Sequence, residues 1–322
     1  MPTIVIPDDA PPVMAASEAY ARLLRRMRVD YHDTLPGSEE RLIERIGAAE
    51  IVINIRSSSL FTENVFRQAP HLRLLSLWGT GTDNVDLAAA ARHGVTVTNT
   101  PGVSAFSIAE HALALMLAAA RRIPQIDGEM RQGRWPRGHA AQMHGKTLGI
   151  IGLGAVGRRF AFLGAAIGMR VIAWTMHPQP ALGFELVTLD DLLRLSDVVS
   201  LHLRLSAETR GFIGKRELGM MKPSAILINT ARGPIVDEPA LIEALATKRI
   251  AAAGLDVFAV EPLPPGHPLT RLENVVLTPH CAGITAEALE AGLRLSIDNV
   301  WNFLNGSPTN VVGREPLGRR EA

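Results

Sequence analysis

The chain has 322 residues, of which 47% are hydrophobic and 20% charged, and this composition is that of a globular protein long enough for two domains. A formal net charge of +1 excludes strong electrostatic attraction to nucleic acid or to an anionic membrane. The single cysteine, Cys281, excludes an intrachain disulfide, and no apolar run has the length of a membrane span. Because Asp8 and Asp9 also argue against a signal peptide, we expect a cytoplasmic protein.

The first hundred residues alternate short apolar runs with amphipathic segments. We expect strands at residues 3–6, 51–55, 72–77 and 95–98, and helices at residues 15–27 and 39–46. Asp86 is expected to cap a further helix that Gly94 ends, because a short acidic side chain favours the start of a helix and glycine its end. Strands that alternate with helices predict a parallel sheet with helices on both faces.

Pro101 and Gly102 interrupt this pattern, and Ser104 is expected to cap an alanine-rich helix that runs through Ala120. The segment that follows, residues 121–144, is polar, looks irregular and contains Trp135. It fits either a solvated connection or an arm that covers a neighbouring subunit, and its residues do not decide between the two.

A glycine turn then stands between two apolar runs, Leu148 to Ile151 and Val171 to Trp174. The turn reads Gly152-Leu153-Gly154-Ala155-Val156-Gly157, a G-x-G-x-x-G, and leads into a predicted helix that Gly168 ends. Strand, glycine turn, helix and strand in this order indicate a dinucleotide site. The first glycine permits the tight turn, the second lets backbone approach a pyrophosphate, and the third lets helix pack on strand. The helix N-terminus then offers its N–H groups to the phosphates.

The second block continues in the same alternating way. We expect strands at residues 198–203, 225–228, 251–257 and 275–277, short helices after Thr188 and from Asp237 to Ala246, and a helical tail at residues 284–305 followed by an extended segment at 308–312. The chain therefore predicts a second doubly wound domain.

Three polar side chains follow strands of this second block, where ligands of open parallel sheets bind. Arg232 fits a planar, two-pronged contact with a carboxylate, or is an ordinary surface arginine. His280 fits proton transfer near neutral pH, or is a hydrogen-bonded core histidine. If the strands are neighbours, the Glu261 carboxylate reaches the ring nitrogen of His280 that does not face a substrate. Such a pair, beside an arginine and a nicotinamide, is what the oxidation of a 2-hydroxy acid requires.

Other chemistry is disfavoured. The 10 histidines include no close pair with ligand spacing, and one cysteine makes no thiolate cluster, so we expect no bound metal. There is no G-x-S-x-G elbow and no G-x-x-x-x-G-K-[ST] loop, which argues against hydrolase and P-loop chemistry.

Over nearly its whole length the chain resembles the D-isomer-specific 2-hydroxyacid dehydrogenase family. The resemblance rests on GLGAVG, INTARG, GLDVFAVEPLPPGHPL, NVVLTPHCAG and NTPGVSAFSIAEHALALML. It implies an α/β fold of two doubly wound parallel-sheet domains. A Rossmann dinucleotide-binding domain, residues 102–286, would be inserted into a flavodoxin-like substrate-binding domain made of residues 1–101 and 287–322.

The resemblance also implies roles for individual residues. Arg232, Glu261 and His280 would be catalytic, with Arg232 orienting the substrate and the other two forming the acid–base pair. Substrate contacts would come from Arg56, Thr80, Gly81, Arg232 and His280. The implied cofactor contacts are Ser107, Gly152, Gly154, Ala155, Val156, Gly157, Thr175, His177, His202, Thr209, Thr230, Ala231, Arg232, Asp256, His280 and Gly283.

The turn after Trp174 departs from the family pattern. Members specific for NAD have an acidic residue there for the ribose 2′-hydroxyl, whereas this chain has no Asp or Glu between Gly157 and Glu185. No arginine stands at the turn to bind a 2′-phosphate, and Thr175 and His177 suit either cofactor. We expect NAD or NADP, with dual or NADP-leaning use.

We expect a homodimeric reductase of small 2-oxo acids such as hydroxypyruvate or glyoxylate, with no nucleic-acid or membrane partner. One alternative is a nicotinamide-sensing corepressor or binding protein on the same fold. Another is a phosphoglycerate dehydrogenase that lacks a regulatory domain, since the chain length disfavours a phosphoglycerate dehydrogenase that carries one. Glu261 argues against the formate-oxidising relatives, because these need no proton transfer.

Overall fold

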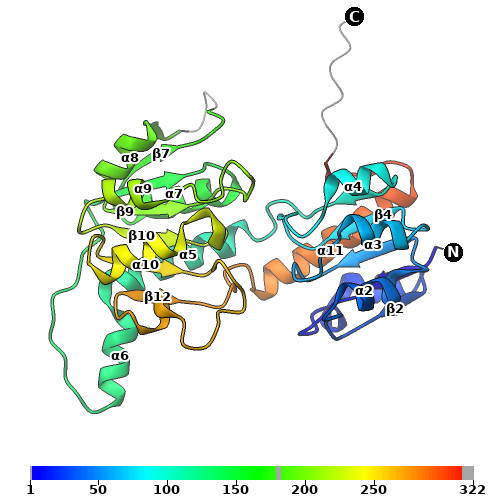
Figure 1. The fold of residues 1–322 in the computed structure, drawn as a ribbon, viewed down its shortest axis with the longest axis horizontal. Helices are drawn as coiled ribbons and strands as arrows, with labels where there is room; N and C mark the ends of the chain where they lie inside the picture. The colour runs from blue at the N-terminus through cyan, green and yellow to red at the C-terminus, as the bar shows by residue number, and fades with distance from the viewer. Residues whose placement is uncertain (1, 179–182, 314–322) are drawn as a thin grey trace, which may run out of the picture. The chain divides into compact units, whose positions relative to one another are not determined.

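The computed structural model describes residues 2–178 and 183–313, and the chain divides into two compact units. Unit 1 comprises Met1–Ser104 and Thr285–Ala322, and unit 2 comprises Ala105–Ile284. Figure 1 shows both units and labels many of their helices and strands. The predicted fold class is confirmed, since each unit is built on a mainly parallel sheet with helices on both faces.

The sheet of unit 1 has the strand order β13-β5-β4-β3-β1-β2. Its strands are β1 (Ile4–Ile6), β2 (Val29–Tyr31), β3 (Ile51–Asn54), β4 (Leu74–Leu77), β5 (Thr96–Thr98) and β13 (Val311–Val312). Neighbours run parallel except β13, which pairs antiparallel with β5. The end of the described chain therefore returns to the sheet that the first hundred residues build.

Helices bury their apolar faces against both sides of this sheet. On one side, α1 (Glu18–Leu24) and α11 (Ala286–Leu304) share a core with the 3-10 helix η1 (Met14–Ala16). On the other side lie α2 (Glu39–Ile46), α3 (Glu63–Gln68) and α4 (Leu87–Arg92). The predicted cap at Asp86 is confirmed, because its carboxylate accepts the Ala89 N–H at 2.9 Å.

The helix expected at residues 15–27 is interrupted. Ser17 is extended between η1 and α1, and its hydroxyl accepts the Tyr20 N–H at 3.3 Å. A serine cap starts a new helix because it satisfies one of the N–H groups that lack a partner in the first turn. The expectation of one continuous helix was therefore wrong.

The sheet of unit 2 has the order β12-β11-β10-β9-β6-β7-β8, and its pairs are parallel. The strands are β6 (Thr147–Ile151), β7 (Arg170–Trp174), β8 (Glu185–Leu186), β9 (Val198–Leu201), β10 (Ile226–Asn229), β11 (Ala252–Leu255) and β12 (Val275–Leu277). Because the strands are parallel, their carboxyl ends meet at one edge of the sheet.

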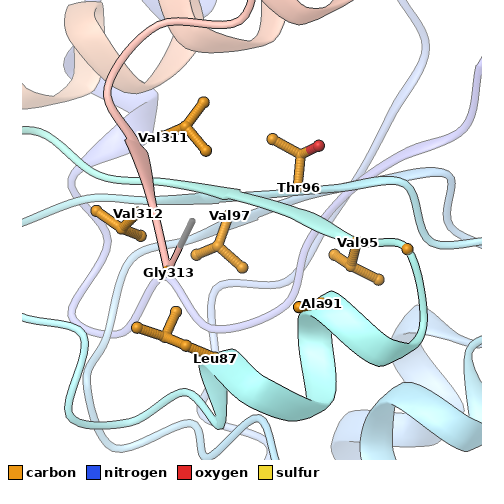
Figure 2. A pocket seen from close by; sticks show the side chains of 9 residues that line it. Leu87, Ala91, Val95, Thr96, Val97, Val311, Val312 and Gly313 are labelled. Atoms are coloured by element: carbon orange, nitrogen blue, oxygen red, sulfur yellow. The ribbon is translucent and has the colours of Figure 1, made fainter. Parts of the chain in front are cut away.

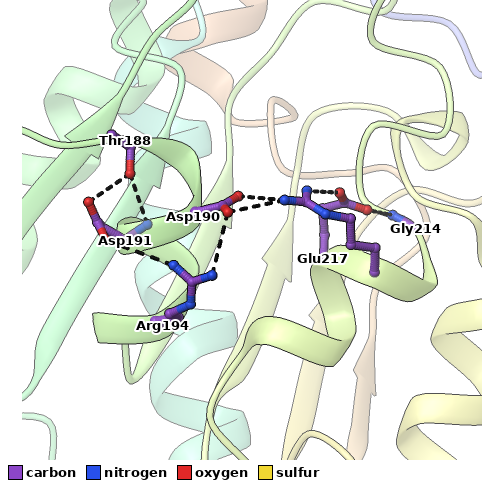
Figure 3. A network of polar contacts seen from close by, with 7 residues as sticks. Thr188, Asp190, Asp191, Arg194, Gly214 and Glu217 are labelled. Carbon is purple, nitrogen blue, oxygen red and sulfur yellow. Dashed lines mark hydrogen bonds and ion pairs between the residues drawn. The ribbon is translucent and has the colours of Figure 1, made fainter.

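Helices again lie on both faces. α5 (Ala105–Arg121) and α7 (Ala155–Ala166) share one apolar core, and α8 (Leu189–Leu195), α9 (Lys215–Met220) and α10 (Glu238–Ala246) share the other. On the second face, Asp190 of α8 pairs with Arg194 at 3.5 Å and with Arg216 of α9 at 2.9 Å (Figure 3). These ion pairs are exposed, so apolar packing contributes more to joining the helices. Among the described residues, no helix is both long and apolar enough to cross a membrane.

The segment at residues 121–144 is not wholly irregular as expected, because it contains α6 (Ile123–Arg131). Arg122 adopts a left-handed conformation with φ 54°, which separates α6 from α5, and Pro124 suits the first turn of a new helix. Prediction also missed β2, β8, α3 and α9, which are short and carry little periodic signal.

In unit 1, α11 packs closely against Trp78, the residue after β4. A Cβ on Gly292 would lie 2.2 Å from Nε1 of Trp78. The same nitrogen donates to the Leu289 carbonyl at 3.4 Å, which fixes the indole against the helix. Glycine at position 292 therefore allows α11 to pack closely on the sheet of unit 1.

We predict that Gly292→Ala lowers the apparent free energy of unfolding by about 1–3 kcal/mol, because the added methyl group overpacks this contact. The matched control is Gly219→Ala in α9, where nothing lies within 4 Å of the added Cβ. Urea denaturation followed by tryptophan fluorescence measures both. Equal midpoints for the two variants would contradict the packing argument.

Candidate active site

The predicted cofactor and catalytic residues of unit 2 follow neighbouring strands at one edge of the sheet. In sheet order, β12 leads to His280 and Gly283, β11 to Asp256 and Glu261, β10 to Thr230, Ala231 and Arg232, β9 to His202 and Thr209, β6 to the glycine turn, and β7 to Thr175 and His177. Ser107 lies in the first turn of α5. The chain order reverses between β6 and β9, and ligands of doubly wound sheets bind beside such a reversal.

In the glycine turn, two of the three glycines leave no room for a side chain, and the third faces open space. Gly152 has φ +99°, and a Cβ there would lie 2.7 Å from the His202 carbonyl oxygen. A Cβ on Gly157 would lie 2.0 Å from the Gly152 carbonyl oxygen. Nothing lies within 4 Å of the Cβ position of Gly154, which begins α7 without a side-chain cap. The first-turn N–H groups, those of Ala155 and Val156 included, thus fit a pyrophosphate.

The turn after β7 lies beside the glycine turn, since the Gly152 N–H donates to the Trp174 carbonyl at 2.8 Å. Within this turn, the Thr175 hydroxyl accepts the His177 N–H at 3.4 Å. Phe212 packs on the Trp174 ring, with centroids 5.2 Å apart. The turn contains hydroxyl and imidazole groups and no carboxylate.

His202 belongs to the scaffold of the glycine turn. Its N–H donates to the Ile151 carbonyl at 2.8 Å, and its Nε2 lies 2.9 Å from the Ser200 hydroxyl. Burial lowers the pKa of His202 to about 3. The ring is therefore neutral near pH 7 and unsuited to donate a proton there.

Two threonines line the same edge. The Thr209 hydroxyl accepts the Ser206 N–H at 2.8 Å and donates to the Arg204 carbonyl at 2.7 Å, so it closes its loop. The Thr230 hydroxyl is buried and, within the described part of the chain, has no hydrogen-bond partner. A buried hydroxyl without a partner costs free energy unless a ligand or water satisfies it. Thr230 is therefore the threonine that fits a direct ligand contact.

His280 and Glu261 form the predicted carboxylate–histidine contact. Nδ1 of His280 lies 2.6 Å from Oε2 of Glu261, and the side chains are 38% and 33% exposed. The contact follows from topology, because β11 and β12 are neighbours and each residue follows one of them. With Nδ1 engaged by the carboxylate, Nε2 remains available for proton transfer. The geometry confirms the contact, and its catalytic role stays a prediction.

The environment keeps Glu261 ionised. Burial raises the pKa of Glu261, but hydrogen bonds from the His280 ring and the Phe258 N–H, together with the charges of His280 and Arg232, outweigh it and hold the pKa below its usual value. A carboxylate that stays charged is the form that binds and orients a histidine ring.

Arg232 lies in a turn that touches the Glu261 loop. Asn229 fixes the turn by accepting the Ala231 N–H and donating to the Arg232 carbonyl, both at 3.0 Å. A Cβ on the next residue, Gly233, would lie 1.9 Å from the Phe258 carbonyl carbon. The guanidinium and the carboxylate–histidine pair are therefore carried by two loops in backbone contact.

Asp256 anchors the loop that carries His280. Its fully buried carboxylate accepts the Cys281 N–H at 3.0 Å, the Ala282 N–H at 2.9 Å and the Thr278 hydroxyl at 2.6 Å. These bonds bracket His280, which has the left-handed φ of 51°. The sequence pointed to Asp256 as a cofactor contact but gave no signal of this anchoring role.

His111, Asp256 and Cys281 place possible metal-ligating atoms within 4.8 Å of one another. The Asp256 oxygens are already bonded, and His111 Nε2 lies 2.9 Å from the Thr278 hydroxyl. Burial and the Asp256 charge raise the pKa of the Cys281 thiol, which disfavours the thiolate that a metal needs. The arrangement fits a hydrogen-bond network, and the expectation of no metal stays a prediction.

The predicted substrate contacts Arg56, Thr80 and Gly81 follow β3 and β4 of unit 1. Within the described residues, the N–H groups of Thr80 and Gly81 donate no hydrogen bond, although the Thr80 carbonyl accepts the Asn99 side chain at 2.8 Å. Arg56 is held by its neighbours: its N–H donates to buried Asp8 at 3.3 Å, and its guanidinium donates to the Pro11 carbonyl.

Among the described residues, no titratable side chain lines a pocket in unit 1, so this lining offers no group for proton transfer (Figure 2). It lies between α4 and the β5–β13 pair. Its described lining is Leu87, Ala91, Gly94, Val95, Thr96, Val97, Val311, Val312 and Gly313. The carboxyl edge of the unit 2 sheet therefore remains the site with acid–base groups.

Comparisons with known proteins agree with this geometry. The family model described as "D-isomer specific 2-hydroxyacid dehydrogenase, NAD binding domain" matches residues 113–282. The chain is 42% identical over 300 residues to a glyoxylate reductase of Aeropyrum pernix, covering 89% of each protein. It is also 42% identical over 290 residues to a D-3-phosphoglycerate dehydrogenase of Archaeoglobus fulgidus, covering 87% of this chain and 55% of that one.

Solved structures give the same result. An acyclic imino acid reductase, Bsp5, in complex with NADPH and D-Arg has a TM-score of 0.89 and 30% identity, with 96% of this chain and 99% of that one covered. A glyoxylate reductase from Paecilomyes thermophila has a TM-score of 0.87 and 28% identity, with 96% and 97% covered. The chain belongs to the D-isomer specific 2-hydroxyacid dehydrogenase family.

Proposed function

We propose that the protein is an NAD(P)H-dependent reductase of small 2-oxo acids, with hydroxypyruvate or glyoxylate as substrate and a 2-hydroxy acid of the D series as the chiral product. The observation that carries the proposal is the 2.6 Å contact of His280 with Glu261 at the sheet edge that also holds Arg232 and the glycine turn. The relatives named glyoxylate reductase support the choice of a small substrate.

When bound, the reduced nicotinamide supplies a hydride to the carbonyl carbon of the substrate. Nε2 of His280 donates the proton that the carbonyl oxygen needs, so that C=O becomes CH–OH. Arg232 offers guanidinium donors to the substrate carboxylate and to the negative charge that develops on this oxygen. Glu261 holds Nδ1 of the ring and keeps Nε2 in place during the transfer. His280 then takes a proton from solvent, and in the reverse direction it acts as the base.

Each unit has a proposed part. Unit 2 is the dinucleotide-binding domain, which the family match at residues 113–282 supports. Unit 1 is the substrate-binding domain, in which the undonated N–H groups of Thr80 and Gly81 receive a carboxylate and Arg56 gives a further contact. A cytoplasmic location fits Cys281, which is free and is the single cysteine of the chain.

A spectrophotometric screen of 2-oxo acids tests the activity. We predict the highest kcat/KM with glyoxylate or hydroxypyruvate, and a fall in kcat of about 100- to 10,000-fold in His280→Ala, the scale of a lost general acid. His71→Ala, at an exposed position of unit 1, is the control and should match the wild type.

Three results would contradict parts of this proposal. Cofactor binding without turnover of any 2-oxo acid favours a nicotinamide-sensing binding protein. A preference for 3-phosphohydroxypyruvate favours phosphoglycerate dehydrogenase. A large loss of cofactor affinity in His280→Ala contradicts the role given to that residue.

We propose that NADPH is used at least as well as NADH. The turn after β7 adjoins the glycine turn and has no carboxylate to bind the ribose 2′-hydroxyl or to repel a 2′-phosphate. Thr175 and His177 offer neutral or cationic donors instead. The NADPH bound in the structure of Bsp5, which is 30% identical, is compatible with this proposal.

Steady-state kinetics with both reduced cofactors test this preference. We predict that His177→Asp lowers kcat/KM for NADPH relative to NADH by roughly tenfold or more, because like charges repel, and tenfold corresponds to about 1.4 kcal/mol. His71→Asp, at an exposed position of unit 1, controls for added charge. A strong preference of the wild-type protein for NADH would contradict the proposal.

We propose a homodimer in which a second copy covers α6 and the segment after it. No residue of α6 is buried, and Ile123, Ile126 and Met130 recur at helical spacing with 54%, 36% and 42% exposure. Trp135 follows with 71% exposure. An apolar stripe with this exposure favours an arm over the solvated connection that the sequence left open.

Light scattering after size-exclusion chromatography measures the mass. We predict a dimer for the wild type and a shift towards monomer for the double variant Ile126→Glu, Trp135→Ser, because both changes remove apolar area from the proposed contact. Leu35→Glu, which changes an apolar residue of unit 1 with 46% exposure, should remain a dimer. A monomeric wild type, or a double variant with unchanged mass, argues against the arm.

A further inference from the structure

A further histidine–carboxylate pair lies in unit 2, among residues to which the reaction assigns no part. Nε2 of His267 is 3.3 Å from Oε1 of Glu238, and the two side chains are only 16% and 17% exposed. We propose that Glu238, oriented by His267, is a positioning residue. It fixes the turn that carries Glu261 and thereby keeps the Glu261 carboxylate in contact with the His280 ring. This inference rests on the proposed function, because it assigns Glu261 and His280 to proton transfer.

The turn from Phe258 to Glu261 is held by two carboxylates. The Phe258 N–H donates to Oε1 of Glu261 at 2.9 Å, and the Ala259 N–H donates to Oε2 of Glu238 at 3.1 Å. Charged acceptors make these bonds stronger than bonds to a neutral carbonyl. Since the other Glu261 oxygen contacts His280, Glu238 fixes the backbone from which Glu261 reaches the ring.

Backbone also approaches this turn closely. A Cβ on Gly233 would lie 1.9 Å from the carbonyl carbon of Phe258 and 2.5 Å from the nitrogen of Ala259. Gly233 opens the 3-10 helix η2 (Gly233–Ile235), and Glu238 begins α10 a few residues later. Gly233 and Glu238, which lie close together in the chain, therefore both contact the turn.

His267 is itself held in place, with its Nε2 directed at Glu238. Its Nδ1 accepts the Leu269 N–H at 3.4 Å, as the cap of η3 (Pro268–Arg271). A ring that accepts at Nδ1 carries its hydrogen on Nε2, the atom that faces Glu238. The His267 carbonyl also accepts the Thr270 N–H and hydroxyl, at 3.0 and 2.7 Å, which anchors the histidine itself.

The proposal has a pH-dependent consequence. Burial raises the pKa of Glu261, and the bonds from His280 and Phe258, with the charge of Arg232, bring it below the usual value. A looser turn weakens the Phe258 bond, so the pKa of Glu261 rises. The ionised carboxylate is the active form, and activity is lost as pH falls through this pKa. Loss of Glu238 should therefore move the acidic limb of the activity profile to higher pH.

The experiment compares pH profiles of kcat/KM for the full-length wild type, Glu238→Ala, Glu238→Gln and His267→Ala, with hydroxypyruvate and saturating reduced cofactor. For Glu238→Ala we expect the acidic limb of the kcat/KM profile to move to higher pH by about half a pH unit or more. Its kcat should fall roughly two- to tenfold, the scale of one lost hydrogen bond. Glu238→Gln keeps an acceptor for the Ala259 N–H and should lie between Glu238→Ala and the wild type. His267→Ala should shift the limb in the same direction by less.

Glu243→Ala is the matched control, because Glu243 lies on the same helix and forms an exposed pair with Lys215. It should keep the wild-type profile, and cofactor affinity by fluorescence titration should be unchanged in all variants. A lower kcat in Glu238→Ala with an unmoved acidic limb would show a merely structural role and overturn the proposal. If Glu238→Ala does not fold by circular dichroism, an unmoved limb in both Glu238→Gln and His267→Ala overturns it equally.

Failure of the proposed function looks different. The proposed reaction is contradicted if the wild type turns over no 2-oxo acid, or if His280→Ala keeps full activity. If turnover depends on His280 but the acidic limb does not move in the Glu238 variants, only the positioning role of Glu238 is contradicted.

Discussion

The contact between His280 and Glu261 depends on a buried carboxylate that is not part of it. Asp256 binds two backbone N–H groups and one hydroxyl around His280, whose left-handed backbone is disfavoured for a residue with a side chain. That conformation costs about 1–2 kcal/mol. Hydrogen bonds to a charged acceptor contribute about 1.5–3 kcal/mol each, so those of Asp256 outweigh the strain. The fold therefore supports an unfavourable backbone where it presents the ring.

Two histidines at the same sheet edge have opposite environments. His202 lies against the glycine turn, and its burial holds the ring neutral. His280 has a carboxylate on one ring nitrogen and is partly exposed. A ring that is desolvated and has no charge partner suits a scaffold, whereas a ring held by a carboxylate suits a group that gains and loses a proton. The difference supports assigning the acid–base role to His280.

Much of this edge was predictable from residue order. Parallel strands bring their carboxyl ends together, so the polar residues after β10, β11 and β12 were expected to meet, and the Glu261–His280 contact does form. The supporting carboxylates were not predictable in the same way. Glu238 looks like an ordinary first-turn acid of α10, and only side-chain geometry shows that it accepts the Ala259 N–H and lies 3.3 Å from the His267 ring.

Local structure was least predictable where one residue overrides a periodic pattern. Ser17 divides a segment that the apolar spacing joins, because its hydroxyl satisfies a helix N–H. Arg122, in a left-handed conformation, separates α6 from α5 in a segment that was expected to be irregular. Such outcomes depend on a single backbone conformation that sequence patterns do not encode.

The configuration of the product tests the central claim most directly, namely that this edge directs hydride to one face of a 2-oxo acid while His280 protonates the oxygen. Hydroxypyruvate is reduced with NADPH or NADH, and the resulting glycerate is resolved by chiral chromatography. The account predicts D-glycerate as the single enantiomer, formed in amounts equal to the cofactor oxidised. L-glycerate, a racemic product, or cofactor oxidation without glycerate would contradict it.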